Sequence, residues 1–334
     1  MVSRFLVFFA LLAFNSAIIA QPTSLGTHPI EENRQTVSPK PPEPYTCLFG
    51  VYPVSLYDFD FSQRSFKINF YAWWRTHNKD YHPDKSVEIV NAKEYYSKFG
   101  KVGKNGNEYF TYVHYYTTIP YNWDVRYFPF DRQFLPVKLE DFSDIQYVIF
   151  KPDYKQSHLH SELSLLGWNL VGMKLKDSIT HYKTNFGDAS TEKGSYSRLT
   201  FIIEIKRIGW RTYFNYFIGF FVAFFLSLLI YFIHPRNFSD RSSLALGAIF
   251  SAVGNKYIVD QHLPITSSIT LADVIQITTF MMISISVLNF VVLQNLEDIC
   301  KFKNILKANY TLAALMTLLY ISIVGYYTYI AVNS

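Results

Sequence analysis

The chain has 334 residues, of which 49% are hydrophobic, and it carries a formal net charge of +5. Only 11 of its 31 basic and 26 acidic residues lie after residue 212, so the second half is too poor in charge for a water-soluble domain. This distribution excludes a simple cytosolic enzyme and indicates a water-facing half joined to a membrane half, while the scattered lysines and arginines give no nucleic-acid footprint.

The first 20 residues are predicted to form a secretory signal peptide. Arg4 supplies the charge before the apolar run Phe5 to Phe14, and small residues follow as far as Ala20. An uncleaved anchor is the alternative, but this run is shorter than the roughly 20 residues that span a bilayer. Residues 21–44 contain six prolines and are expected to form an extended arm without a core of its own.

Residues 45–211 are predicted to form an all-β extracellular domain, an immunoglobulin-like sandwich. Short aromatic and β-branched runs are broken by Gly, Asn, Asp and Pro, and residues 199–205 are apolar at every second position. No nucleophile elbow, phosphate-binding loop, dinucleotide fingerprint or zinc-type cysteine pair is present, so neither an enzyme nor a cofactor is predicted. Histidine pairs at 77 and 82 and at 158 and 160 leave a metal site as an alternative to plain solvation.

Residues 212–334 are predicted to form a transmembrane domain of four helices. Four segments are long enough to cross a bilayer at about 1.5 Å rise per residue. They are 213–233, 242–259, 274–293 and 310–332. The second contains serine, glycine, asparagine and lysine, so its polar groups need water or protein rather than lipid.

Loop charges predict the orientation in the cell membrane. The loops after the first and third segments carry lysines and arginines, whereas residues 260–273 carry none. The positive-inside rule therefore places those two basic loops in the cytosol. The signal peptide independently sends the N-terminal half to the extracellular or periplasmic side, and four spans return the C-terminus to that side.

The run Tyr-Phe-Pro-Phe-Asp-Arg-Gln at 127–133 resembles the signature loop of the pentameric ligand-gated ion channels, the Cys-loop receptor superfamily. The resemblance extends over most of 45–332. Residues 66–75 look like the family's second strand, residues 196–207 like its last strand entering the first membrane helix, and residues 260–264 like the exit from the pore helix. It implies a homopentamer in a lipid bilayer that conducts inorganic ions.

The sequence departs from this family at three points. Tyr121 and Leu135 stand where the bridging cysteines would be, so the loop disulfide is missing, as in the prokaryotic branch. The link 294–307 is too short for the large intracellular domain of animal receptors. The Trp-x-Pro-Asp ligand-loop motif is absent between 91 and 109, so the sequence does not predict whether the chain has a conventional agonist site.

One face of the second segment is predicted to line the pore. Steps of three and four residues give a stripe of 3.5-residue period that is small and polar at most positions. Its members are Asp240, Ser243, Gly247, Phe250, Gly254, Tyr257 and Gln261. Five such faces around an axis would line a water path, as the resemblance also implies. The apolar positions 246, 249, 253 and 258 are expected to pack.

Three residues of this segment have predicted roles. A ring of Asp240 at the cytosolic mouth would favour cations, and the alternative is that this carboxylate, preceding the helix, stabilises its N-terminus. Phe250 is the candidate hydrophobic gate, with packing between helices as the alternative. Lys256 is expected to pair with Asp260, whereas a lumen-facing Lys256 would favour anions.

The resemblance also implies which residues couple the two domains. The loop residues Phe128, Pro129, Phe130 and Asp131 would sit above the membrane. An ion pair between Asp131 and Arg207 would then transmit motion to the loop carrying Pro264. A static surface ion pair is the alternative.

The family gathers ligand-binding aromatics between subunits, where ring faces suit ammonium groups. The matching positions are Tyr71, Trp73, Trp168, Tyr182 and Tyr196. The alternative for each of these residues is that it is an ordinary aromatic residue of the core. The predicted function is therefore a subunit of a homopentameric, cation-selective channel gated by an unidentified small molecule or a proton, and the alternative is a non-conducting receptor of the same fold.

Overall fold

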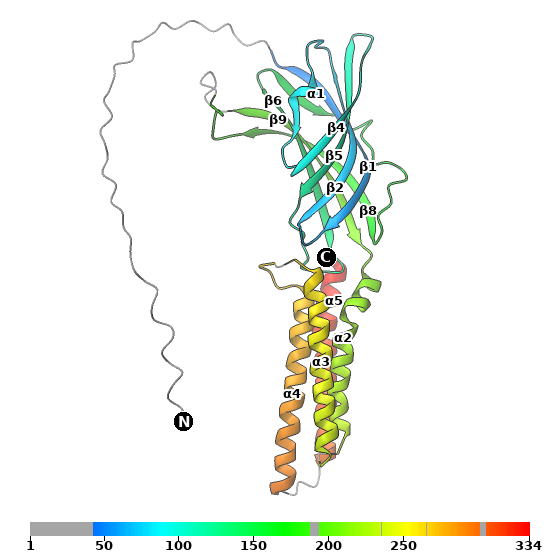
Figure 1. Cartoon of the computed structure of the whole chain (residues 1–334), viewed down its shortest axis with the longest axis vertical. Coiled ribbons are helices and arrows are strands. Elements are labelled where there is room, and N and C mark those ends of the chain that lie inside the picture. The colour runs from blue at the N-terminus through cyan, green and yellow to red at the C-terminus, as the bar shows by residue number, and fades with distance from the viewer. Residues whose placement is uncertain (1–42, 188–193, 235, 265, 301–304) are drawn as a thin grey trace, which may run out of the picture. The chain divides into compact units, whose positions relative to one another are not determined.

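The computed structural model describes residues 43–187, 194–234, 236–264, 266–300 and 305–334 (Figure 1). The predicted signal peptide and almost all of the predicted arm lie outside these residues. The first part of the described chain is built of strands and the second part of helices, in the order that the sequence predicts. One short helix, α1 (Pro83–Ser86), lies among the strands and is an exception to the expected all-β domain.

The strands form two sheets. A five-stranded sheet has the order β4-β5-β2-β1-β7 and a four-stranded sheet has the order β3-β6-β9-β8. Their bounds are β1 Tyr45–Asp60, β2 Ser65–Thr76, β3 Val87–Ile89, β4 Glu94–Asn105, β5 Glu108–Pro120, β6 Arg132–Asp144, β7 Val148–Pro152, β8 Trp168–His181 and β9 Ser195–Arg207. Neighbouring strands are antiparallel except β1 and β7, which run parallel.

The inward faces of the two sheets share an aromatic and aliphatic core, which makes the arrangement sandwich-like. Every second residue of β2 and β9 is buried, so the alternation predicted for 199–205 is confirmed. The rings of Phe70 and Phe201, one from each sheet, lie 5.1 Å apart. Cys47 is fully buried in this core, and burial raises the pKa of its thiol.

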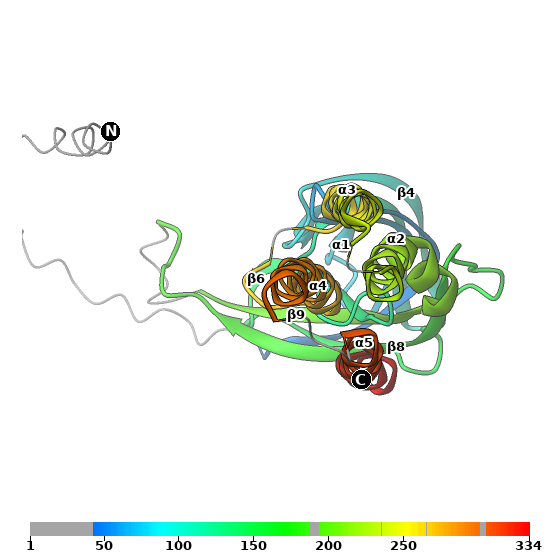
Figure 2. The same ribbon diagram turned by 90° about the horizontal axis from the view of Figure 1, so that it is seen from below.

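Four long helices follow the strands. They are α2 (Gly209–Leu229), which ends in the 3-10 turn η1 (Ile230–Phe232), then α3 (Phe238–His262), α4 (Leu271–Cys300) and α5 (Ile305–Asn333). The helices α3, α4 and α5 each contain one predicted segment and extend beyond it at both ends, because hydropathy marks only the apolar part of a helix. The first predicted segment, 213–233, begins inside α2 and runs one residue past the end of η1. In Figure 2, α3 and α5 lie on opposite sides of the pair α2 and α4.

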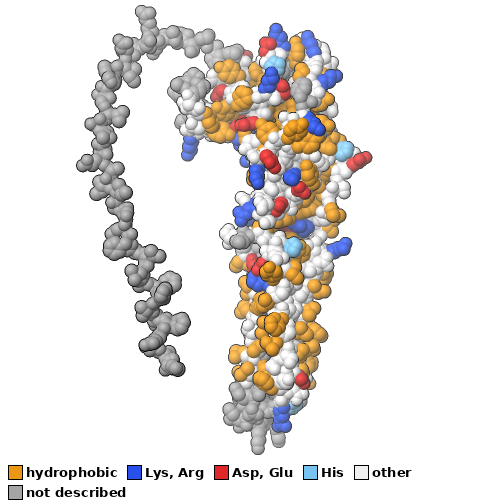
Figure 3. All heavy atoms as spheres, in the orientation of Figure 1, with side chains coloured by type: hydrophobic (Ala, Val, Ile, Leu, Met, Phe, Trp, Pro, Cys, Tyr) orange, Lys and Arg blue, Asp and Glu red, His pale blue; other side chains and the backbone are white. Residues whose placement is uncertain are grey.

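Three helical stretches of the described residues are long and apolar enough to cross a membrane: Gly209–Phe232, Leu271–Val292 and Lys307–Asn333. The predicted second span, 242–259, is helical within α3 but is too polar to belong with them. Figure 3 agrees with this division, because charged side chains gather mainly over the strands and the visible helical face is mostly uncharged.

A glycine and two polar side chains set the contact between α2 and α3. Asn255 Nδ2 donates to the carbonyl of Tyr216 at 2.8 Å, and Ser251 Oγ donates to the carbonyl of Gly219 at 3.0 Å. A Cβ added at Gly219 would overlap the side chain of Asn255. The absence of a side chain at 219 therefore lets the two helices approach closely, as small residues do in membranes.

We expect Gly219→Ala to destabilise the helices by about 1–3 kcal/mol, because the added methyl forces Asn255 away from its acceptor. Thermal unfolding of the detergent-solubilised protein measures this loss. Gly325→Ala is the matched control, since an added Cβ there meets nothing within 4 Å. Equal melting temperatures for the two variants would contradict the proposed close contact.

Candidate functional site

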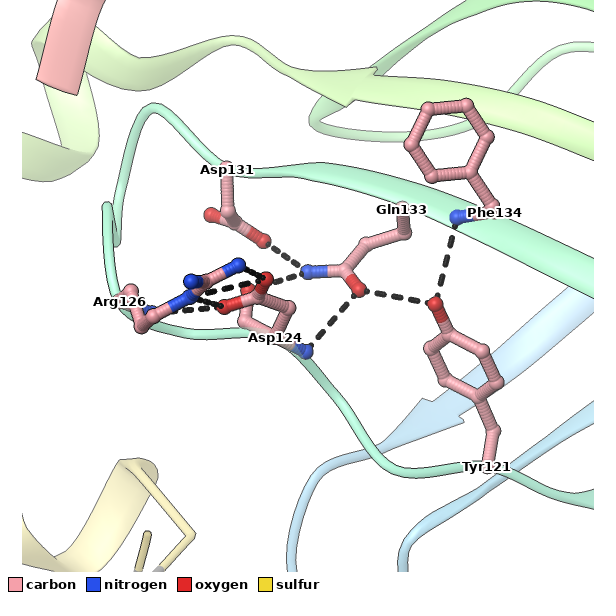
Figure 4. Close-up of polar contacts among 6 residues, drawn as sticks. All are labelled: Tyr121, Asp124, Arg126, Asp131, Gln133 and Phe134. Atoms are coloured by element: carbon pink, nitrogen blue, oxygen red, sulfur yellow. Dashed lines mark hydrogen bonds and ion pairs between the residues drawn. The ribbon is translucent and has the colours of Figure 1, made fainter. Parts of the chain in front are cut away.

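The loop between β5 and β6, residues 121–131, is closed by a buried glutamine (Figure 4). Gln133 Nε2 donates to the carbonyl of Asp124 at 2.8 Å and to the Asp131 carboxylate at 2.7 Å. Its Oε1 accepts from the backbone N–H of Asp124 and from the Tyr121 hydroxyl. One amide thus joins both ends of the loop. The motif quoted above ends on Gln133, but its role was not predicted.

Asp131 and Arg207 form the predicted ion pair. Arg207 Nε donates to Asp131 Oδ1 at 2.7 Å, and its Nη2 donates to Oδ2 at 3.2 Å. The side chain of Asp131 is 2% exposed and that of Arg207 is 12% exposed. The small stabilisation that is typical of an exposed ion pair therefore does not apply to this pair. Removing one partner would leave the other charge buried without an opposite charge beside it.

Aromatic rings surround the Arg207 guanidinium. Its central carbon lies 4.0 Å from the Trp168 ring centroid and 5.0 Å from the centroids of Phe61 and Phe128. Cation–π attraction therefore adds to the ion pair in a partly desolvated place. Trp168, predicted among the ligand aromatics, is instead at this junction. We call Arg207, Asp131 and these three rings the arginine cage.

The loop also contacts the first two turns of α2, which begins directly after the cage. The Phe130 ring lies 5.0 Å from Trp210 and 5.6 Å from Tyr213. A Cβ at Gly209 would overlap Phe130, so only glycine fits between the strand and this helix. The Phe128 ring lies 5.3 Å from Tyr216.

The α2 helix also contacts the end of α3 near this loop. The ring of Tyr216 lies 5.4 Å from the ring of His262, the last residue of α3. Pro264, a predicted coupling residue, borders a pocket of about 260 Å³ together with Ser62 and Arg64 of the β1–β2 turn. The predicted coupling residues thus lie around the junction of strands and helices, although Pro264 faces the β1–β2 turn.

The predicted pore stripe lies on one side of α3. Asp240, Ser243, Phe250, Gly254, Tyr257 and Gln261 are exposed, and Gly247 is half-buried. The opposite side carries the buried residues Arg241, Ala245, Ala248, Ala252, Asn255 and Val259, with the same spacing of three and four. The side chain of Arg241 fixes this rotation at the start of α3, because its Nε donates to the carbonyl of Ile230 at 3.1 Å.

Two details of α3 differ from the prediction. Asp240 lies in the first turn rather than before the helix, which begins at Phe238 after the N-cap residue Asn237. The apolar positions 246, 249, 253 and 258 are exposed on the flanks of the stripe, not packed within the chain. Small side chains pack instead, because they permit the close approach to α2. The expected pair of Lys256 with Asp260 is confirmed at 2.5 Å.

Tyr71 and Trp73 lie together in a groove of about 550 Å³ on the outward face of the five-stranded sheet. Arg75, Glu108 and Tyr112 also line it, and Arg75 Nη2 pairs with Glu108 at 2.7 Å. Gly50 and Gly100 lie under the rings of Trp73 and Tyr112, where a Cβ would overlap each ring. The glycines therefore let these rings lie flat on the sheet.

Tyr182 and Tyr196 form a separate cluster on the four-stranded sheet, with ring centroids 5.6 Å apart. The Tyr182 hydroxyl donates to Glu140 at 2.8 Å and accepts from Arg198 at 2.9 Å. Partial burial, followed by the Glu140 carboxylate, raises the pKa of Tyr182. The five predicted ligand aromatics are thus divided among three places, with Trp168 in the arginine cage and the other four residues on the outward faces of the two sheets.

No protein-family model matches the chain, and no curated protein matches it. In the part of the chain that the structure describes, no three His, Cys, Asp or Glu side chains gather as metal ligands. The Nδ1 of His160 instead lies 2.8 Å from the Tyr52 hydroxyl.

We expect Arg207→Met to destabilise the protein by about 3–5 kcal/mol, because the buried Asp131 carboxylate would lose its positively charged partner and keep only the hydrogen bond from Gln133. Differential scanning fluorimetry of the detergent-solubilised protein measures the shift in melting temperature. Arg132→Met is the control, since it breaks a neighbouring pair with Glu204 in which the arginine is 41% exposed. Equal shifts for both variants would show that the arginine cage stabilises the protein no more than the exposed pair of Arg132 with Glu204 does.

Proposed function

We propose that the chain is a subunit of a homopentameric ligand-gated ion channel, with α3 lining a cation-selective pore. The observation that carries the proposal is the division of α3 into two faces. One face packs on the chain's own helices, and the opposite face, small and polar at most positions, has no cover in a single chain. A water-filled axis shared by five copies would cover it.

The neighbours of α3 support this assignment. Three apolar stretches could cross a bilayer, and α3 packs against two of the helices that contain them, α2 and α4. A helix that carries polar groups at membrane depth must turn them to protein or water. The exposed apolar flanks, including Leu246 and Val253, would then lie between neighbouring copies.

Asp240 is the selectivity residue in this proposal. Its carboxylate is exposed, in the first turn of α3, at the end of the stripe far from the strands. Five copies would form a ring of negative charge at one mouth, which attracts cations. The same carboxylate also interacts favourably with the helix N-terminus, and the two roles are compatible.

The outer strands would supply the ligand site. The groove with Tyr71 and Trp73 and the cluster of Tyr182 with Tyr196 lie on outward faces of different sheets, so one chain cannot join them. Two adjacent copies could place them face to face. Aromatic ring faces suit a small cation, in keeping with a small amine as agonist, while Glu108 and Glu140 are each paired with an arginine.

Ion flux decides between the channel and the non-conducting receptor. The purified protein is reconstituted into K⁺-loaded liposomes, and K⁺ release is recorded during a screen of small amines and steps of external pH. Release that depends on one of these stimuli would support the channel. Liposomes that stay tight under every stimulus would favour the receptor.

We expect Asp240→Ala to reduce cation selectivity, because it removes the charge at the pore mouth. In planar bilayers under a KCl gradient, the reversal potential should move at least halfway toward zero. Asp177→Ala, which removes a carboxylate of β8, is the control and should leave it unchanged. A wild-type reversal potential in Asp240→Ala would refute selection by this ring.

We expect Phe250→Ala to make the channel leak, because a ring of phenylalanines, each 72% exposed in the single chain, would otherwise dewet the closed pore. The measurement is K⁺ release from liposomes without any added ligand. Ile249→Ala, one position away from the stripe, should stay as tight as wild type. If both variants stay tight, Phe250 is not the gate.

A further inference from the structure

The turn before β8 carries a fully exposed leucine. The N–H of Trp168, the first residue of β8, donates to the carbonyl of Leu165 at 3.2 Å, which closes a β-turn with Leu166 and Gly167 at its two central positions. Gly167 has a φ of +81°, as the third residue of a type II turn requires. Leu165 is buried and Leu166 is 102% exposed, so the turn holds one leucine inside and the next one outside.

This turn is fastened to the beginning of α2. The N–H of Ile208, the residue before α2, donates to the carbonyl of Gly167 at 2.9 Å, and the first residue of β8 pairs with the last residue of β9. In Figure 1, β8 accordingly begins close to the start of α2. Leu166 therefore lies beside the point where the strands end and the stretch Gly209–Phe232, apolar enough to cross a membrane, begins.

The exposed leucine extends an apolar stripe of α2. Exposed apolar side chains recur along α2 at steps of four and then three residues, and each is between 45% and 58% exposed. They are Trp210, Phe214, Ile218, Val222 and Phe225. Ile208, which is 51% exposed, joins this stripe to the turn. A single exposed leucine needs no explanation, whereas one that continues a larger apolar surface indicates a partner for that surface.

The length of the apolar stretch gives the depth of this surface in a membrane. Its 24 residues span about 36 Å at about 1.5 Å per residue. The hydrocarbon layer of a bilayer is about 30 Å thick, and the headgroup zones extend the bilayer to about 40–45 Å. A stretch centred in the bilayer therefore has its first residues just outside the hydrocarbon, in the zone where tryptophans such as Trp210 are enriched. Leu166, held beside Ile208, falls in the same zone.

The charges near the turn suit lipid headgroups. Residues 163–170, which contain the turn, carry no charged side chain, so entry into the headgroup zone strips no charge of water. Arg211 is exposed in the first turn of α2, one residue after Trp210. A guanidinium at this depth reaches lipid phosphates, while the apolar side chains beside it enter the boundary of the acyl chains.

We propose that the Leu166 turn of the strand domain inserts into the lipid bilayer, in the leaflet nearest the strands, beside the first turn of α2. Lipid is the occupant, rather than a second copy of the chain, because the turn continues the surface of a stretch that can itself cross the membrane. The insertion needs a bilayer around α2 but neither ion conduction nor a particular number of subunits. A protein that carries no ions would therefore refute the channel proposal alone.

A fluorescent probe at position 166 tests the insertion. Leu166→Cys is made in the full-length protein with Cys300→Ser, labelled with bimane and reconstituted into phosphatidylcholine nanodiscs. Cys47 is fully buried and stays unlabelled. Because the Leu166 side chain is fully exposed, its replacement removes no packing from the fold.

Lipids that carry a nitroxide next to the headgroup should quench about half of the emission from position 166, because a side chain buried at the headgroup boundary contacts that nitroxide. Phe142→Cys, made and labelled in the same background, is the matched control. Phe142 is 62% exposed near the end of β6 that lies away from α2, so its probe should keep its full emission.

The wavelength of the emission distinguishes the two contrary results. An unquenched probe at 166 that emits at the wavelength of the Phe142→Cys probe would show that the turn lies in water. An unquenched probe that is shifted to the blue would show that a neighbouring copy of the chain covers the turn. Either result would overturn the proposal, whether or not the protein conducts ions.

Discussion

The buried ion pair between Asp131 and Arg207 is the contact on which the rest of the architecture depends. It lies where the last strand becomes the first long helix, and it is shielded from water by the rings of Trp168, Phe61 and Phe128. Burying two charges is costly unless their geometry and hydrogen bonding are good. Here two hydrogen bonds, the rings and the Gln133 amide meet that requirement, so strands and helices are joined at a fixed point.

Beyond this ion pair, the positions of the helices are set by contacts of the backbone and of small side chains more than by contacts of bulky ones. Gly209 leaves room for Phe130, Gly219 leaves room for Asn255, and alanines line the buried side of α3. Carbonyl groups of α2 accept hydrogen bonds from Ser251 and Asn255. This close packing fixes the rotation of α3 about its axis, and that rotation determines which side chains stay uncovered.

The strand domain presents two aromatic surfaces that do not meet within one chain. One is a groove whose rings lie flat over glycines, and the other is a cluster bound to a buried Glu140–Arg198 pair. Both are outward-facing, so a shared ligand would need a second copy of the chain. A channel of several subunits would use the same symmetry for its ligand sites and for its pore.

The sequence alone determined the order of strands before helices, the alternation of the core strands and the polar stripe of α3, because these depend on local periodicity and composition. It also indicated the partners Asp131 and Arg207 through a resemblance. Tertiary structure alone decided the caging of Arg207, the position of the Leu166 turn beside α2 and the separation of Trp168 from the other aromatics. Those contacts join residues far apart in the chain, and no local pattern encodes which distant backbone group or ring will lie within reach.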